Sequence, residues 1–438
     1  MTAASATQAP GRLSTYLAAL TWKIGATVAG VVATLITARA LGPSDRGALT
    51  QLLIALGLAA TIGGLGRGEA YLYHRRVSGG ADRASLLASC VPMSLLAAIA
   101  APGLLLAFAA AGGPSSPGWW AWAAAAGLFA GLGRMGLSLA KLDTSLATFN
   151  RMAVLQPMLF LAGTLALLAI DAVGLGEVAA VYALSLIAPG LWSVRLCLRE
   201  AAEPPVSFPR PAWRRLALKG WMTELFAVAS LQADKVVVMA LLGVADLGVY
   251  SVAATLTIGF SVIQDGLANT VLARASGSPL ERVWPEVRRA WGLYLGAGAL
   301  LLGAMAAFAG PALWALLGPG YAGVEGPLLV LAAAAFIGGA SWILATTFAC
   351  LGRPELVLAR QVVGVAVTLA LAVPLAREHG LTGIAWATFA GASARLLLGV
   401  ALLRLRFNMA MKDLILPVEG RAALRIMGRA CRAAWAPR

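Results

Sequence analysis

The sequence predicts an all-α integral membrane protein with about twelve transmembrane helices, arranged as two pseudo-symmetric six-helix bundles around a central cavity. The first observation is composition. Of the 438 residues, 60% are hydrophobic and 12% charged, with a mean hydropathy of +0.82, which leaves too little polar surface for a soluble protein of this size. The second is that the apolar runs approach the ~20 residues that a helix needs to cross a bilayer. The third is an internal repeat.

This repeat is a seven-residue pattern, L-G-x-x-D-x-G, which occurs as LGPSDRG at residues 41–47 and as LGVADLG at residues 242–248. Each copy lies between two long apolar runs. Each is therefore typical of a hairpin in which the first glycine ends one membrane helix and the aspartate caps the next. Because both copies hold the same place in the helix order, they indicate that the chain consists of two similar halves.

Hydropathy, together with the Pro and Gly residues that separate the apolar runs, predicts six spans in each half. Because six is an even number, both halves enter the membrane from the same side, as a parallel repeat about an axis along the membrane normal. The predicted domains are an N-terminal bundle at 1–198, a proline-rich cytoplasmic linker at 199–216, a C-terminal bundle at 217–404 and a basic cytoplasmic tail at 405–438. The predicted spans are 16–38, 47–73, 85–110, 119–140, 151–171, 178–198, 217–242, 247–272, 290–316, 326–351, 356–376 and 382–404.

The distribution of Lys and Arg predicts the orientation, because these residues tend to remain on the cytoplasmic side of a membrane. One set of alternate loops, with the span ends beside them, carries most of the basic residues, whereas the opposite set carries chiefly Arg39, Arg46 and Arg377. The basic residues of the first set are Arg75, Arg76, Arg83, Lys141, Arg151, Arg199, Arg210, Arg214, Arg215, Lys219, Arg274, Arg282, Arg288, Arg289, Arg353 and Arg360. Both termini are therefore predicted to be cytoplasmic, and both L-G-x-x-D-x-G hairpins to face the outside.

The net charge of +15 follows mostly from this topology, and the sequence contains no motif typical of a nucleic-acid-binding module. In the tail, four arginines fall on one helical face, which is typical of a segment that lies on the anionic cytoplasmic leaflet. A disordered basic tail is the alternative. The four residues are Arg421, Arg425, Arg429 and Arg432.

Three basic residues lie deep within predicted spans, where a charge is costly and by default indicates a function. Counted at ~1.5 Å per residue from the outer ends, Arg134 lies ~22 Å along the fourth span and Arg395 ~20 Å along the twelfth. Both are too deep to snorkel outward, and Lys235 lies within the seventh span. An excess of basic residues at this depth predicts an anionic ligand, and phosphate is the group that arginine clusters suit best. These three residues are therefore candidates for substrate binding.

Other charged residues in the spans are open to two interpretations. Arg67, beside Glu69, approaches the inner end of the second span, so it is a further substrate-binding candidate that could instead snorkel to the surface. Asp234 and Lys235 point ~100° apart on a helix, so they are not expected to pair simply with each other. Asp265 either neutralises an arginine across a helix interface or faces the cavity. Asp234 and Asp265 are the candidates for ion coupling or gating.

Catalytic, metal and cofactor sites are not indicated by the sequence. The two histidines, His74 and His379, lie in or beside loops without metal-ligand spacing, the four cysteines have no motif spacing, and no P-loop occurs. The outer loops are short, whereas a membrane glycosyltransferase or polymerase would be expected to carry a sizeable outer loop or an acidic loop motif. The sequence therefore predicts a transporter rather than an enzyme, with no cofactor and no metal.

Several segments resemble a known family. Residues 38–47, ARALGPSDRG, resemble the A-R-x-L-G-P-x-x-x-G signature near the start of bacterial polysaccharide or lipid-linked oligosaccharide flippases. In the second half, Asp234-Lys235 with residues 242–254 is similar to the D-[RK]…LG…G-x-Y-x-x-A stretch of this family. Residues 351–354 are similar to its L-G-[RK]-P turn, and the whole resemblance covers about residues 15–405.

The resemblance implies the multidrug/oligosaccharidyl-lipid/polysaccharide exporter fold, in which two six-helix bundles face each other in a V. It also implies a multi-pass flippase of the bacterial cytoplasmic (inner) membrane. Such a protein moves an undecaprenyl-pyrophosphate-linked oligosaccharide to the outer leaflet by alternating access, for surface polysaccharide or lipopolysaccharide synthesis. Twelve spans match the shorter members, whereas peptidoglycan-precursor flippases usually have fourteen.

The implied partners are the lipid-linked anionic glycan and membrane lipid, with a coupling ion and other polysaccharide-assembly proteins as further candidates and no nucleic acid. Two alternatives remain. The first is a cation-coupled multidrug exporter of the same superfamily, in which Asp234 would be an ion site. The second is a membrane-embedded glycan polymerase or transferase.

Overall fold

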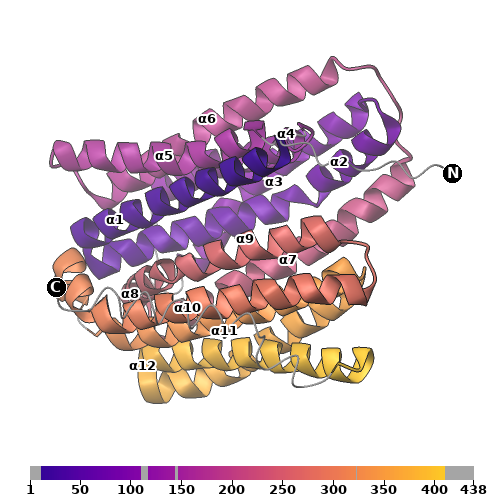
Figure 1. Cartoon of the computed structure of the whole chain (residues 1–438). Helices are drawn as coiled ribbons and strands as arrows, with labels where there is room; N and C mark the ends of the chain where they lie inside the picture. The colour runs from indigo at the N-terminus through magenta and orange to yellow at the C-terminus, as the bar shows by residue number, and fades with distance from the viewer. Residues whose placement is uncertain (1–10, 110–116, 144–146, 322, 410–438) are drawn as a thin grey trace. The chain divides into compact units, whose positions relative to one another are not determined.

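The computed structural model describes residues 11–109, 117–143, 147–321 and 323–409, and this part of the chain is almost entirely helical (Figure 1). Within it, the only β-type pairing is an isolated bridge between Ala81 and Pro205. The predicted tail arginines lie outside the described residues. The helices are α1 (Gly11–Gly64), α2 (Arg67–Ser78), α3 (Arg83–Ala109), α4 (Pro117–Ala140), α5 (Ala147–Ala169), α6 (Leu175–Ala201), α7 (Arg210–Leu241), α8 (Val244–Leu256), α9 (Ile258–Ala275), α10 (Leu280–Leu317), the 3-10 helix η1 (Pro319–Tyr321), α11 (Glu325–Cys350) and α12 (Pro354–Phe407).

Two of these helices are each long enough for two spans. The apolar part of α1, Thr21–Gly64, has 44 residues, and that of α12, Glu355–Phe407, has 53. At ~1.5 Å per residue, each exceeds twice the ~30 Å thickness of a bilayer core. Each is broken by a glycine with positive φ, Gly42 at 74° and Gly380 at 55°. Each therefore forms a pair of spans joined at a tight corner.

The remaining spans follow from the other helices of the described ranges. Six further helices, α3 to α6, α10 and α11, are long and apolar enough to cross a membrane, and α8 with α9 makes one bent span with a 40° angle. Helix α7 is more charged, but its 32 residues reach ~48 Å. With α1 and α12 counted twice, the described residues form twelve spans. The predicted all-α membrane fold is confirmed.

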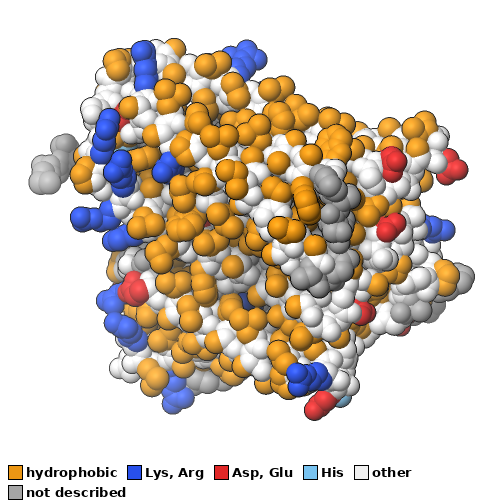
Figure 2. Space-filling model, turned by 180° about the vertical axis from the view of Figure 1, so that it is seen from behind, with side chains coloured by type: hydrophobic (Ala, Val, Ile, Leu, Met, Phe, Trp, Pro, Cys, Tyr) orange, Lys and Arg blue, Asp and Glu red, His pale blue; other side chains and the backbone are white. Residues whose placement is uncertain are grey.

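Large apolar side chains remain exposed on these helices, as expected where the neighbour is lipid rather than water. Ile99, Phe308 and Leu397 are 70%, 68% and 68% exposed. Figure 2 shows hydrophobic side chains over most of the visible face. A soluble monomer rarely exposes an apolar patch larger than a few hundred Å². This surface is therefore that of a multi-pass membrane protein.

The chain packs as two compact units, described here separately. One core of unit 1 surrounds Tyr71 and Met135, and one core of unit 2 surrounds Tyr294 and Phe348. Helix α7 begins in unit 1 and ends in unit 2. The predicted bundle bounds, 1–198 and 217–404, are based on the position of the linker and of the repeat in the sequence, whereas these units are defined by packing. The bundle bounds therefore stay a prediction. Unit 1 is Met1–Leu41 with Ala48–Ala229, and unit 2 is Gly42–Gly47 with Ser230–Arg438.

The two copies of the L-G-x-x-D-x-G repeat touch each other within unit 2. A Cβ atom on Gly47 would lie 1.8 Å from the carbonyl oxygen of Val244, and one on Gly248 would lie 1.9 Å from the carbonyl oxygen of Pro43. The two glycines hold the same position in the repeat, and Pro43 and Val244 also correspond. The contact is therefore reciprocal, and it depends on the absence of a side chain at both glycines.

The predicted turn chemistry of the repeat is partly confirmed. Gly42 and Gly243 have φ values of 74° and 101°, a region that favours glycine, so the first glycine of each copy does interrupt the helix. The predicted aspartate cap is wrong for α8. Its N-cap is Gly243, without a side-chain hydrogen bond, and Asp246 lies in the first helical turn. There its negative charge interacts favourably with the helix dipole instead.

The segment between α6 and α7 is fastened to the start of α3 in unit 1. The Asp82 carboxylate accepts hydrogen bonds from the backbone N–H of Phe208 at 2.9 Å, and from the N–H and hydroxyl of Ser85 at 3.1 and 2.9 Å. Burial raises the pKa of the Asp82 carboxyl, but these hydrogen bonds together outweigh it and hold the pKa below its usual value. Asp82 therefore caps α3 and anchors the linker at the same time.

Replacing Asp82 by alanine is expected to lower the free energy of unfolding by about 1–3 kcal/mol, because the buried N–H of Phe208 loses its acceptor. The folded pKa lies below the unfolded value of about 3.9, so this stabilisation is fully present above that pH and is lost as the pH falls through the lowered pKa. Thermal unfolding of wild type and D82A at neutral pH and near pH 3 measures both effects. The control S85A removes only one donor and should cost less. Equal stability of D82A and wild type at neutral pH would contradict this anchor.

Candidate functional site

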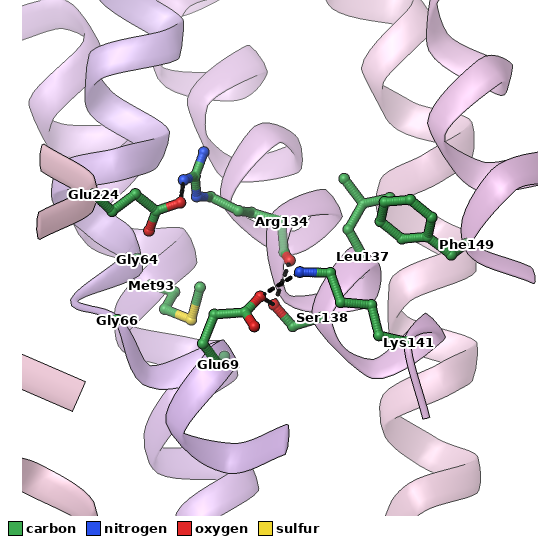
Figure 3. A pocket seen from close by; sticks show the side chains of 11 residues that line it. Gly64, Gly66, Glu69, Met93, Arg134, Leu137, Ser138, Lys141, Phe149 and Glu224 are labelled. Atoms are coloured by element: carbon green, nitrogen blue, oxygen red, sulfur yellow. Dashed lines mark hydrogen bonds and ion pairs between the residues drawn. The ribbon is translucent and has the colours of Figure 1, made fainter. Parts of the chain in front are cut away.

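A cavity of about 210 Å³ lies within unit 1, among the helices that surround Arg134 (Figure 3). Helix α4 and the turn after it supply most of the polar side chains, and α1, α2, α3, α5 and α7 complete the walls. The lining residues are Gly64, Gly66, Gly68, Glu69, Met93, Arg134, Leu137, Ser138, Lys141, Phe149 and Glu224.

Glycines in the turn before α2 and at the start of α2 let the walls of this pocket come together. The chain turns through Leu65 and Gly66, which have φ values of 45° and 62°. A Cβ atom on Gly66 would lie 2.0 Å from the carbonyl oxygen of Ala217, and one on Gly68 would lie 2.6 Å from the hydroxyl of Ser138. Without side chains at these positions, α2 approaches both α7 and α4 closely enough to bring their polar residues to one cavity.

The pocket contains two basic and two acidic side chains, joined in pairs. The Arg134 guanidinium forms an ion pair with the Glu224 carboxylate, and Lys141 Nζ lies 2.6 Å from Glu69 Oε1. The Ser138 hydroxyl donates to the same Glu69 oxygen at 3.1 Å. Figure 3 shows Arg134 directed toward Glu224, while Lys141, Ser138 and Glu69 converge below it. The pocket therefore holds two cationic centres, each paired with a carboxylate.

The substrate-binding candidates are divided between the two units. Arg134 lines the pocket of unit 1, whereas Lys235 and Arg395 belong to unit 2. Arg67 lies in unit 1 but outside the residues that line the pocket, and its guanidinium donates to the carbonyl oxygen of Ala88. Within unit 1, the structure therefore joins Arg134 to residues other than the predicted ones.

A second polar cluster surrounds Asp234 in unit 2. The carboxylate of Asp234 accepts a hydrogen bond from the Tyr250 hydroxyl at 3.0 Å, and Tyr250 in turn contacts the Thr388 hydroxyl at 3.4 Å. Lys235 Nζ lies 3.8 Å from Asp234 Oδ1. The expectation that these neighbours do not simply pair with each other is confirmed in part. Their contact is long, and each side chain has a closer partner elsewhere, since Lys235 Nζ donates to the carbonyl oxygen of Leu231 at 3.2 Å and Asp234 accepts from Tyr250. Asp234 also has an electrostatic interaction with Arg395.

Arg395 occupies space that glycines leave open. A Cβ atom on Gly364 would lie 2.3 Å from Cγ of Arg395, and one on Gly338 would lie 3.8 Å from its Nη2. Asp265, the other predicted gating residue, lies on α9 and accepts a hydrogen bond from Gln264 at 3.3 Å. The structure thus groups Asp234, Lys235 and Arg395, and places Asp265 on another helix of the same unit.

Two charged residues of the pocket, Lys141 and Glu224, are not among the binding candidates that the sequence indicates. The sequence places Lys141 among the loop cations that predict the orientation. One feature of the sequence indicates a functional role for Glu224, because it is an ionisable residue within the predicted span 217–242. The sequence also places Arg360 among these loop cations. Arg360 is only 3% exposed, and its guanidinium donates to the carbonyl oxygen of Ser341 at 2.7 Å.

Metal ligands do not gather in the described part of the chain, where no three His, Cys, Asp or Glu side chains form a group that could hold a metal ion.

Comparisons with solved structures show which proteins share this fold. The chain is similar to a structure of the lipid II flippase MurJ in an inward closed conformation, with a TM-score of 0.73 and 12% identity over 95% of this chain and 93% of that one. It is similar to a multidrug resistance MATE family transporter of the MOP superfamily in an inward-facing conformation, with a TM-score of 0.66 and 15% identity over 87% and 94% of the two chains.

A MOP superfamily transporter from Pyrococcus furiosus is a third similar structure, with a TM-score of 0.58 and 14% identity over 89% of this chain and 95% of that one. At these identities the likeness shows the fold. No protein-family model and no curated protein sequence matches the chain.

Proposed function

We propose that this protein is a flippase that moves an undecaprenyl-pyrophosphate-linked oligosaccharide across the bacterial cytoplasmic membrane for surface polysaccharide synthesis. The observation that carries the proposal is the pocket that Arg134 and Lys141 both line. Arginine presents a planar fork of donors that matches phosphate, and lysine adds a compact point charge. A pyrophosphate headgroup offers two phosphates to two cationic centres.

The fold supports transport rather than catalysis. Solved proteins with this architecture include one titled a lipid II flippase and others titled multidrug resistance transporters. We infer that the chain works by alternating access, in which the polar head passes through the protein while the lipid tail stays in the bilayer. In this mechanism Lys235 and Arg395 provide a second set of cations for the head, and Arg67 lies on its route from the cytoplasm.

Asp234 and Asp265 are the proposed coupling or gating residues. Asp234 has Lys235 Nζ at 3.8 Å and an electrostatic interaction with Arg395. A carboxylate with two fixed cations nearby attracts a further cation weakly. This favours a gating role for Asp234, in which the anionic head replaces Asp234 as the partner of Lys235 and Arg395. It disfavours the sodium or proton site that a cation-coupled multidrug exporter would need.

Reconstitution into liposomes tests the proposal. A fluorescent short-chain polyprenyl diphosphate sugar is placed in the membrane, and a membrane-impermeant reducing agent quenches only the outer leaflet. We expect the protein to make the inner-leaflet pool accessible, and to leave a polyprenyl sugar without phosphate untouched. Mass spectrometry should find the sugar unchanged in length.

Two results would overturn the assignment. Gradient-driven export of a cationic dye, with no movement of the diphosphate lipid, would make the protein a multidrug exporter. Extension or transfer of the sugar by the purified protein would make it an enzyme of glycan assembly.

A further inference from the structure

Both cations of the unit 1 pocket already have carboxylate partners. Arg134 pairs with Glu224, and Lys141 pairs with Glu69 at 2.6 Å. The formal charges of these four side chains cancel. A phosphate-bearing cargo that enters this pocket therefore meets cations that are already neutralised, so affinity cannot come from unopposed positive charge.

Adding an anion to the pocket without other change would place it beside two carboxylates. Like charges at a few ångströms repel strongly where water is scarce. Carboxylate and phosphate also compete for the same donors, because both bind the planar fork of the guanidinium. Two-point binding of a phosphate to Arg134 therefore requires Glu224 to withdraw.

We propose that Glu224 is the internal counter-ion of Arg134, which the phosphate of the cargo displaces, and that Glu224 thereby sets the affinity and the anion selectivity of the pocket. This inference rests on the proposed function and adds a specificity-determining residue to it. Ligands without an anionic group cannot release Glu224 from Arg134, so they gain no access to the guanidinium.

The position of Glu224 suits such an exchange. One turn earlier on α7, the indole N–H of Trp221 donates to the carbonyl oxygen of Thr61 at 3.1 Å, which holds this part of the helix against α1. The side chain of Glu224 is 37% exposed and borders the cavity, so it can rotate away while its helix stays in place. Arg134 is 29% exposed, which leaves its guanidinium open to the cavity.

Glu69 interacts electrostatically with Arg134 but has its ion pair with Lys141. Its side chain is 53% exposed, and its partner Lys141 is 35% exposed. Ion pairs with this exposure contribute little because water screens them. The Ser138 hydroxyl also donates to Glu69, so this carboxylate has a second polar partner that does not depend on Lys141. The exchange is therefore expected to be decided mainly at Glu224, the carboxylate in direct contact with the Arg134 guanidinium.

An internal counter-ion also explains how the cargo is released. A phosphate held by an unopposed arginine in a partly desolvated site would dissociate slowly. When Glu224 competes for Arg134, the affinity for the cargo is lower, and the ion pair reforms as the cargo leaves. The carrier then returns to its resting state without a trapped ligand.

Isothermal titration of the detergent-purified full chain with inorganic pyrophosphate tests the proposal. E224Q is expected to bind pyrophosphate about tenfold more tightly than wild type, because the isosteric amide no longer competes for Arg134. E69Q should change the affinity less than about threefold. The matched control is E203Q, because Glu203 is similarly exposed at 50% and pairs with Arg75 at 3.4 Å, outside the pocket; its affinity should equal that of wild type.

The outcomes separate this inference from the proposed function. If Glu224 only stabilised the fold, E224Q would melt at a lower temperature and bind pyrophosphate no more tightly, which would overturn the counter-ion role. In that case the phosphate site still stands if wild type binds pyrophosphate and R134M does not. If neither wild type nor E224Q binds pyrophosphate, both the counter-ion role and the phosphate site are wrong.

Discussion

Flipping of a polyprenyl diphosphate sugar is expected to fall about 100-fold when Arg134 and Arg395 are both replaced by methionine. Each guanidinium is proposed to hold a phosphate by charge-assisted hydrogen bonds, and removal of one such partner from a partly buried pair costs several kcal/mol. Methionine keeps an unbranched apolar stem, so the packing of Arg395 against Gly364 is largely retained. The liposome assay measures the rate directly.

The variants must distinguish a loss of substrate binding from a loss of folding. R134M leaves the Glu224 carboxylate without its partner, and an uncompensated charge is destabilising. R134M/E224Q/R395M removes that charge and should fold while remaining inactive. The matched control is R274M, because Arg274 is 65% exposed and pairs with Glu286 at 3.4 Å, away from both polar clusters. It should flip at the wild-type rate. Wild-type flipping by a well-folded R134M/R395M protein would refute the assignment of these arginines.

The helices of this protein are largely predictable, because hydropathy and glycine act locally. The apolar runs predict twelve spans, and the described residues form twelve. The first glycine of each repeat predicts a helix break, and Gly42 and Gly243 have the positive φ values that such breaks need. The aspartate cap fails because the backbone at Gly243 itself begins α8, which moves Asp246 into the first turn.

The candidate site is predictable only in part, because ion pairs depend on how distant helices pack. The depth of Arg134 in its span predicts a functional residue. Its partner Glu224 is 90 residues away, and nothing in the local pattern of α7 indicates that it meets α4. The partner of Arg360 is likewise not indicated by the local sequence. Arg360 sits at the edge of an apolar run, but buried carbonyl and hydroxyl oxygens of Ser341 bind its guanidinium within unit 2.

Substitution at the glycine contact of the repeat is expected to have a large effect on stability. Gly248→Ala is expected to lower the stability of the protein by about 1–3 kcal/mol, because overpacking forces the surrounding structure to shift. The added Cβ would lie 1.9 Å from the Pro43 carbonyl oxygen and 2.9 Å from the Gly47 nitrogen. These are backbone atoms, so no flexible side chain can move aside. A bulkier G248L should prevent the contact entirely and abolish flipping, which the liposome assay detects.

The control for this effect is Gly303→Ala on α10, where no atom lies within 4 Å of the new Cβ. Because alanine favours helix by up to about 1 kcal/mol over glycine, G303A should melt at the same temperature as wild type or higher. A loss of stability in G303A equal to that in G248A would show that the membrane helices are sensitive to any added methyl group, and the contact would then have no special role.

Because the contact is reciprocal, Gly47 and Gly248 are expected to respond alike to substitution. Gly47 meets Val244 in the same way that Gly248 meets Pro43, so G47A should destabilise the protein about as much as G248A. The two substitutions should not add, because either one separates the same two backbone segments, and mutations that share a contact couple rather than sum. Thermal unfolding of both single variants and the double variant measures this coupling. If the losses of stability were additive, each glycine would form its own independent contact. The repeat would then be two turns of similar sequence rather than two copies that pack against each other through one reciprocal contact.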